Sequence, residues 1–222
     1  MNRSDRRQWT LAACLAVLAG YVDAIGFLKL GGLFVSFMSG NSTWLAVAVS
    51  ERAALFSWLA LAIIAAFVGG VILGTLLAHQ AGRARKTAVM ILVTTLLAGA
   101  QGLEIAFGGT LPALVLAVAM GSANCVFLRN GEVSIGVTYM TGTLVKLGQH
   151  LAAACMGGKR FGWLPYLALW AGLITGATCG ALAFGALAVF SLAPAVLAAA
   201  GLTVMAHRMG PAEPLRAMVS SG

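Results

Sequence analysis

Long apolar runs separated by short polar links make up most of the chain. A helix that crosses the hydrocarbon core of a bilayer needs about 20 mostly apolar residues. Eight apolar segments come close to or exceed this length: Leu11–Leu30, Gly31–Ser50, Ala53–Ala78, Ala88–Phe107, Leu111–Leu128, Val133–Met156, Trp163–Phe190 and Ala193–Ala206. No stretch between them has the composition of a soluble domain. The pattern predicts an all-α integral membrane protein, with one transmembrane domain over residues 1–222.

Two of the eight segments contain polar residues that a lipid-facing helix avoids. Gly31–Ser50 carries Ser39-Gly40-Asn41, and Val133–Met156 carries Thr141-Gly142-Thr143. A break inside the bilayer is tolerated only where protein or a water-filled cavity satisfies the released backbone groups. These segments are therefore predicted to be re-entrant or broken helices. A continuous helix with a packing glycine is the alternative.

The basic residues distinguish six crossings from eight. Only 9% of the residues are charged, where about 25% is usual for soluble domains. Cytoplasmic loops of membrane proteins collect Lys and Arg. If the two polar segments enter and leave the membrane on the same side, Lys29 and Arg52 lie outside and 11 of the 14 basic residues are cytoplasmic. These 11 residues are Arg3, Arg6, Arg7, Arg83, Arg85, Lys86, Arg129, Lys159, Arg160, Arg208 and Arg216. We expect six transmembrane helices with both termini in the cytoplasm.

The two halves of the chain repeat one another. Gly20–Asp23 aligns with Gly121–Asn124 at an offset of 101, and Val35–Asn41 aligns with Val137–Thr143 at 102. A third pair of small-residue stripes aligns at an offset of 106: Ala66, Gly70 and Gly74 with Gly172, Gly176 and Gly180. Because each copy would cross the membrane three times, the second copy would have the opposite orientation in the membrane, as in many secondary transporters. This predicts a 3+3 inverted repeat over residues 9–107 and 111–207, with the stripes as helix-packing surfaces.

Composition and motifs exclude several classes of function. The net charge of +8 is scattered at segment ends and forms no basic face for nucleic acid. The four cysteines lack C-x-x-C spacing, so neither a disulfide framework nor a zinc site is indicated. Phosphate-binding loops and hydrolase motifs are absent, so we expect no enzyme activity and no cofactor. The expected partners are a small-molecule solute and membrane lipid, and the glycine stripes also permit a homo-oligomer.

Three blocks of residues resemble the YoaK-type family of bacterial membrane proteins. They are GYVDAIGFLKLGGLFVSFMSGN, AMGSANCVFLRNGEV and VTYMTGTLVKLGQHLA, which begin at Gly20, Ala119 and Val137. Ser39, Ala123 and Met140 stand where the family usually carries Thr, Gln and Val. The missing amide at position 123 puts in doubt any role that it has elsewhere in the family. The resemblance implies a multi-pass protein of the bacterial cytoplasmic (inner) membrane, and it implies little about function because the family is uncharacterised.

Asp23 is the most informative polar residue of the predicted spans. It lies about two-thirds along the first segment, where a charge is costly and usually faces a cavity or a partner. Asp23 and its repeat equivalent Asn124 are therefore candidates for ion binding or for proton coupling. In the alternative interpretation, Asp23 forms a hydrogen-bonded helix–helix contact with Asn124.

The two polar breaks are the candidate solute site. Ser39-Gly40-Asn41 and Thr141-Gly142-Thr143 are predicted to cap half-helices over Ser42–Val49 and Leu144–Ala152. Two helix N-termini meeting in the bilayer would offer N–H groups and a positive dipole end to a solute. Lys146, one turn inside the second half-helix, would strengthen a preference for anions.

This pattern favours a secondary transporter of a small polar or anionic solute. A passive channel on the same pathway is one alternative, and a non-transporting scaffold or partner-binding protein is another. Two acidic residues near segment ends, Glu104 and Glu132, are expected to be solvated.

Overall fold

The computed structural model describes residues 3–129, 132–133 and 135–210. The predictions for Arg216 and for the link residues 130 and 131 lie outside this range. The described residues are helical apart from loops and one pair of two-residue strands, in the order α1 (Arg3–Lys29), α2 (Met38–Ser50), α3 (Ala54–Ala81), η1 (Gly82–Ala84), α4 (Arg85–Ala106), α5 (Leu111–Ala123), η2 (Asn124–Phe127), β1 (Leu128–Arg129), β2 (Glu132–Val133), α6 (Met140–Cys155), α7 (Leu164–Leu187), η3 (Ala188–Phe190) and α8 (Ala193–Arg208).

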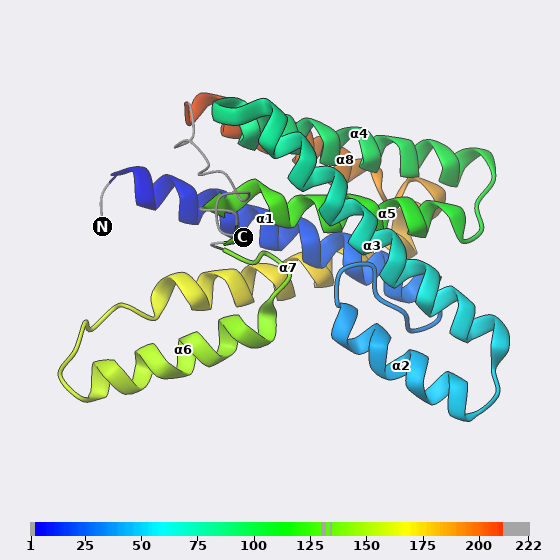
Figure 1. The fold of residues 1–222 in the computed structure, drawn as a ribbon, viewed down its shortest axis with the longest axis horizontal. Coiled ribbons are helices and arrows are strands. Elements are labelled where there is room, and N and C mark those ends of the chain that lie inside the picture. Colours follow the sequence, from blue (N-terminus) through cyan, green and yellow to red (C-terminus); the bar gives the residue numbers. More distant parts are fainter. Residues whose placement is uncertain (1–2, 130–131, 134, 211–222) are drawn as a thin grey trace, which may run out of the picture.

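The long helices form a bundle in which partners come from opposite halves of the chain. α1 packs most extensively on α7, and α3 packs most extensively on α5, while α4 also contacts α5 and α8 (Figure 1). Fully buried apolar side chains of α1, α4 and α5 form much of the core, among them Leu15, Leu97 and Met120. The strands β1 and β2 pair antiparallel directly after η2.

Glycines allow the two main helix pairs to approach closely. A Cβ atom at Gly70 would overlap the carbonyl group of Val118, and one at Gly176 would overlap that of Val17. Small residues at helix interfaces permit such close backbone contact. The interpretation of the small-residue stripes as packing surfaces is therefore confirmed.

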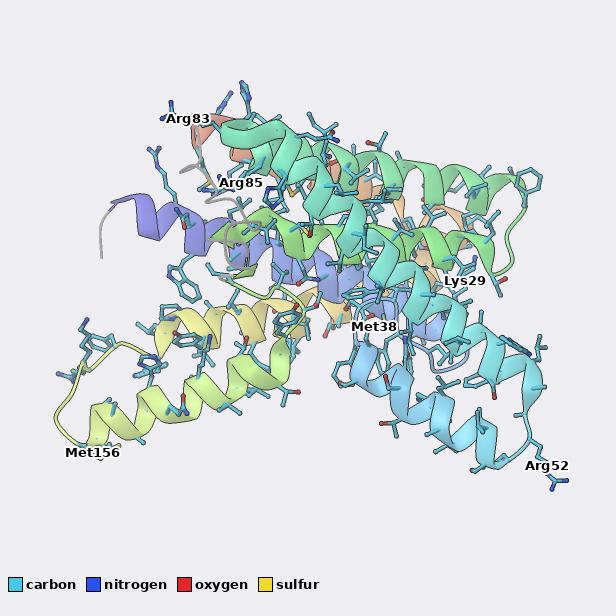
Figure 2. The ribbon with its side chains drawn as sticks, in the orientation of Figure 1. Lys29, Met38, Arg52, Arg83, Arg85 and Met156 are labelled. Carbon is cyan, nitrogen blue, oxygen red and sulfur yellow. The ribbon has the colours of Figure 1, made fainter. Side chains whose placement is uncertain are left out.

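The helices α2 and α6 are short and lie at the edge of the bundle. Their 13 and 16 residues equal those of α5 and α8, so their place in the bundle, and not their length, distinguishes α2 and α6. Each rests mainly on a single helix, α2 on α3 and α6 on α7. Figure 2 shows Met38, the first residue of α2, between the two ends of the molecule, and Arg52, just beyond α2, at one end.

Both short helices begin earlier than the sequence predicts. Ser39–Asn41 and Thr141–Thr143 form the first turns of α2 and α6, whereas they were expected to cap helices that start later. The N-cap residues are Phe37 and Tyr139, and neither uses a side chain as a cap. In the first half the chain already reverses at Gly31 and Gly32, whose φ angles are +65° and +118°. Glycine adopts such angles without steric cost, so the helix can restart sooner.

The outer surface of α3 is suited to lipid. Between Ala54 and Ala78 its large exposed side chains are apolar: Leu55, Trp58, Leu61, Val68, Ile72, Leu73 and Leu76. Three described helical stretches are long and apolar enough to cross a membrane: Arg7–Lys29, Ala54–Ala106, which contains both α3 and α4, and Leu164–Phe190. The apolar helix Leu111–Phe127 is shorter. This surface and these lengths are those of an integral membrane protein.

Charged side chains lie at the two ends of the bundle. Arg83 and Arg85 lie at the end where α1 begins and α8 ends, and Lys29 lies toward the opposite end (Figures 1 and 2). Lys29 forms an ion pair with Glu104, and their side chains are only 14% and 17% exposed. The expectation that Glu104 is solvated is therefore wrong, because the ends of α1 and α4 bring the two charges together.

Candidate functional site

A cavity lies where the two short helices begin. Its volume is about 270 Å³, and its lining comes from the loop before α2, the loop before α6, the first turns of both helices and one residue of α3: Ser36, Phe37, Met38, Ser39, Phe67, Thr138, Tyr139, Met140, Thr141 and Gly142. The structure thus brings Ser39 of the first predicted break next to Thr141 and Gly142 of the second, although about 100 residues separate them in the chain.

Both helices direct their N-termini at this cavity. The first helical backbone bond of α2 runs from the N–H of Asn41 to the carbonyl of Phe37 (3.3 Å). The equivalent bond of α6 runs from Thr143 to Tyr139 (3.0 Å). The amides of the preceding residues have no intrahelical partner at a helix start, and the helix dipole adds a positive partial charge there. The cavity can therefore hold a hydrogen-bond acceptor or an anion.

Asn41 does not contribute its side chain to the cavity. It is fully buried, its Oδ1 accepts a hydrogen bond from the N–H of Phe34 (2.8 Å), and its Nδ2 donates to the carbonyl of Phe34 (2.6 Å). Thr143, at the equivalent position of α6, donates instead to Tyr139 of its own helix (3.1 Å). Asn41 therefore clamps the loop before α2, and within the part of the chain that the structure describes Thr143 makes no equivalent clamp.

Two further predicted site residues lie beside the cavity and do not line it. Gly40 packs against the rings of Phe34 and Phe37. Lys146 is exposed in the second turn of α6. Any contact between Lys146 and a solute would therefore occur outside the cavity, along the surface of α6.

Asp23 and Asn124 bond to equivalent loops. Oδ1 of Asp23 accepts hydrogen bonds from the backbone N–H groups of Val35 and Ser36, both at 2.8 Å. Oδ1 of Asn124 accepts bonds from the N–H (3.4 Å) and the hydroxyl (3.2 Å) of Thr138. Each side chain thus contacts the loop of its own half, and the alternative of an Asp23–Asn124 contact is wrong. Within the described part of the chain, Asp23 forms no ion pair.

Asp23 also lines a second cavity, of about 470 Å³, between α1, the loop before α2 and α7. Apolar residues such as Phe27, Phe34 and Leu173 form most of its wall, and the hydroxyl-bearing Thr178 completes it. As a whole residue, Asp23 is half-buried here. The predicted coupling residue and the predicted solute-binding residues therefore lie at neighbouring places that do not share a cavity.

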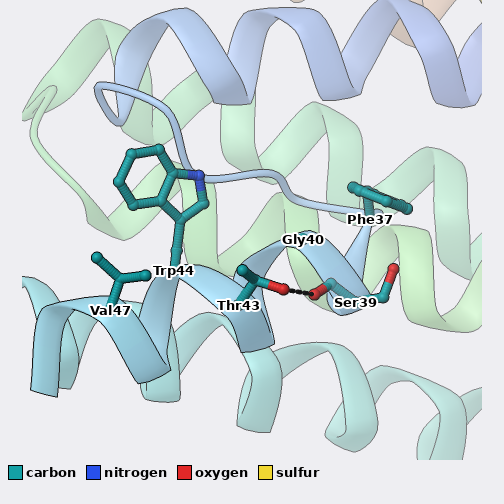
Figure 3. A pocket seen from close by; sticks show the side chains of 6 residues that line it. All are labelled: Phe37, Ser39, Gly40, Thr43, Trp44 and Val47. Atoms are coloured by element: carbon teal, nitrogen blue, oxygen red, sulfur yellow. Dashed lines mark hydrogen bonds between the residues drawn. The ribbon is translucent and has the colours of Figure 1, made fainter. Parts of the chain in front are cut away.

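The outer face of α2 forms a third hollow, of about 540 Å³, with Phe37, Gly40, Trp44 and Val47 in its wall (Figure 3). Ser39 lines this hollow as well as the cavity between the helices. Polar side chains thus continue from the cavity onto an exposed face of α2.

Two lining residues, Ser36 and Thr138, escaped the sequence analysis. They are only 5% and 8% exposed, and they form hydrogen bonds with Asp23 of α1 and Asn124 of η2, respectively. The signal was present, because they are equivalent positions in the repeated block that starts at Val35 and Val137. They were passed over because the breaks were expected three to five residues later.

Comparison with known proteins identifies the family. A profile described as "Protein of unknown function (DUF1275)" matches residues 11–206. The chain belongs to this family. It is similar to UPF0700 transmembrane protein RA0705 of Rhizobium meliloti (strain 1021), with 34% identity over 199 residues that cover 87% of this chain and 86% of the relative.

It is also similar to UPF0700 transmembrane protein YoaK of Bacillus subtilis (strain 168), with 30% identity over 153 residues that cover 64% of this chain and 67% of the relative. No solved structure matches the chain. The resemblance to the YoaK-type family is confirmed, and the chain is a membrane protein of a family whose function is unknown.

Proposed function

We propose that the chain is a secondary transporter of a small polar or anionic solute, with its binding site in the cavity between α2 and α6. The observation that carries this proposal is that one cavity is lined from both predicted breaks and receives the N-termini of two helices. Transporters with repeated halves commonly bind solutes where interrupted helices meet. The proposal includes no catalytic reaction and no cofactor.

The proposed architecture has six crossings, made by α1, α3, α4, α5, α7 and α8, with α2 and α6 as re-entrant half-helices. The reciprocal packing of α1 on α7 and of α5 on α3 supports an inverted repeat. Further support comes from Gly70 and Gly176, which are repeat equivalents and contact equivalent residues of α5 and α1. Since Arg83, Arg85 and both described chain ends share one end of the bundle, we place both termini in the cytoplasm.

The solute chemistry follows from the donors around the cavity. The first-turn amides of α2 and α6, together with the hydroxyl groups of Ser39 and Thr141, favour a solute that accepts hydrogen bonds. Exposed Lys146 favours an anion approaching along α6. Ion binding or proton coupling by Asp23 and Asn124, and assembly into a homo-oligomer, stay predictions.

Thiol accessibility tests for a hydrated pathway. Single cysteines replace Ser39 or Thr141 in a chain whose four native cysteines are changed to alanine or serine, and membrane-impermeant reagents are applied from each side. We expect labelling at both positions and none at V68C, a control on the apolar outer face of α3. Absence of labelling at 39 and 141 would contradict the proposal and favour the scaffold.

Flux into proteoliposomes separates the remaining alternatives. The probes are chloride, formate and glycerol, each compared with vesicles that lack the protein. Saturable flux of at least one probe is expected of a transporter, whereas flux that rises linearly with concentration would indicate the passive channel.

A further inference from the structure

We propose that Asp23 and Asn124 are positioning residues that hold the two loops from which α2 and α6 start, and that an acceptor oxygen, with or without charge, is what these positions require. The inference deepens the proposed function, because these loops determine where the helix N-termini meet the cavity. Each residue contacts its loop through a side-chain oxygen, and the consequence is a fixed starting position for the short helix that follows.

In the first half, one oxygen atom organises the loop. Oδ1 of Asp23 accepts hydrogen bonds from two consecutive amides, those of Val35 and Ser36. Phe37, the next residue, is the N-cap of α2, and Ser39 lies in its first turn. The hydrogen bonds to the amides of Val35 and Ser36 therefore fix the position of the cavity-lining residues that follow them in the chain.

In the second half, an amide oxygen performs the same task. Oδ1 of Asn124 accepts from the N–H and the hydroxyl of Thr138, and Tyr139, the next residue, is the N-cap of α6. The Nδ2 of Asn124 donates to the carbonyl of Met120, one turn earlier, which fixes the orientation of the amide. Since Asn cannot ionise, the negative charge of Asp23 is not needed to hold a loop in this way.

The burial of the two loops explains why they need acceptor oxygens from side chains. Val35 is fully buried, and Ser36 and Thr138 are almost so. Backbone N–H groups that are removed from water must find partners inside the protein, above all at membrane depth. The described residues just before α2 and α6 are not helical, and a side chain of α1 or of η2 supplies the partner for the amides of Val35, Ser36 and Thr138.

Amide hydrogen exchange measured by mass spectrometry on the full chain in detergent tests the proposal. D23A should accelerate exchange about tenfold in peptides that cover 33–37 and leave those over 135–139 within about twofold. N124A should do the reverse. D23N should stay within about threefold of the unchanged chain, since its amide keeps the acceptor oxygen.

Three outcomes would overturn the proposal. D23N could accelerate exchange as much as D23A, which would mean that charge is required. D23A could accelerate exchange equally in both loops and in α4, which would mean a general loss of stability. Unchanged exchange in D23A and N124A would mean that neither residue holds its loop.

A second readout links the loops to the cavity. In the cysteine-substituted chains, D23A should change the labelling rate of S39C about fivefold and that of T141C less than twofold, and D23N should restore the original rate. If S39C and T141C are not labelled even with Asp23 and Asn124 intact, the proposed function fails, while the exchange experiment still decides the positioning role.

Discussion

The two halves of the molecule build similar loops with different side chains. The loop before α2 is held from both sides, by Asp23 of α1 and by Asn41 of α2. The loop before α6 is held by Asn124, whereas the hydroxyl of Thr143, the equivalent of Asn41, donates among the described residues only to the N-cap residue Tyr139. What the halves share is a side-chain acceptor oxygen from the element that precedes the loop, α1 or η2, and what distinguishes them is the charge of that side chain and the second clamp.

This difference separates two kinds of constraint. An unpaired N–H group is costly in the membrane interior, so both halves place an acceptor oxygen opposite the buried amides of the loop. Pairing these amides does not require the negative charge at position 23, the lysine at 146 or the tryptophan at the equivalent position 44. These residues can make the two sides of the proposed transport pathway chemically different.

The largest effect is expected where the halves pack against each other. G70L and G176L should each destabilise the chain by more than about 3 kcal/mol, because any side chain would collide with the carbonyl of Val118 or Val17. G69L and G185L are the controls, since nothing lies within 4 Å of a Cβ atom there. Thermal unfolding in detergent measures the difference. A large loss for G70L with none for G176L would show that the two contacts are not equivalent.

The second prediction compares the loop clamps. N41A should cost about 2 kcal/mol, because it leaves the half-buried N–H and carbonyl of Phe34 without their side-chain partners. T143A should cost less than about 1 kcal/mol, because the Tyr139 carbonyl that it frees also accepts the helical bond of residue 143. Chemical or thermal unfolding of both variants checks this order, and equal losses would remove the proposed difference between the loops.

The third prediction separates charge from geometry at position 23. D23N should leave stability within about 1 kcal/mol, since the amide retains the acceptor oxygen. If Asp23 couples solute movement to protons, the same variant should lose about tenfold in uptake driven by an imposed pH gradient while keeping solute exchange at equal pH. Unchanged gradient-driven uptake would exclude the coupling role and leave the positioning role.

The smallest effect on stability is expected at Lys146. Because this side chain is exposed, K146Q should change the stability by less than about 0.5 kcal/mol. The variant should nevertheless lower chloride or formate flux several-fold and leave glycerol flux unchanged. K146R, which keeps the charge, is the control. Equal loss of anion and glycerol flux would contradict a role in charge selection.

The apolar pattern predicted most of the helical elements. The predicted segment Ala53–Ala78 corresponds to α3, and the polar link between this segment and the next one, Ala88–Phe107, marks the turn between α3 and α4. The link itself is helical up to Ala81 and again from Arg85, so it is shorter than predicted. Polar side chains can end the part of a helix that lies in lipid without ending its backbone hydrogen bonds.

The candidate site was only partly predictable. The repeated polar blocks located the cavity because polar residues inside an apolar segment need a reason to be there. The roles of the residues within the blocks were not predictable. The side chain of Asn41 bonds to the loop before α2 and not to the cavity, and Ser36 lines the cavity wall. Both assignments depend on where the helix starts, and a residue near a helix start can either cap it or belong to its first turn.

The sequence by itself determined the membrane class, the positions of the apolar helices and the equivalence of Gly20–Asp23 with Gly121–Asn124, because hydropathy and spacing are properties of the chain alone. Only the tertiary structure decided that Asp23 and Asn124 bond to separate loops and that Ser39 meets Thr141 across one cavity. Hydrogen bonds between distant residues depend on how the helices pack, and that packing is decided by backbone contacts at glycines, whose partners no local pattern specifies.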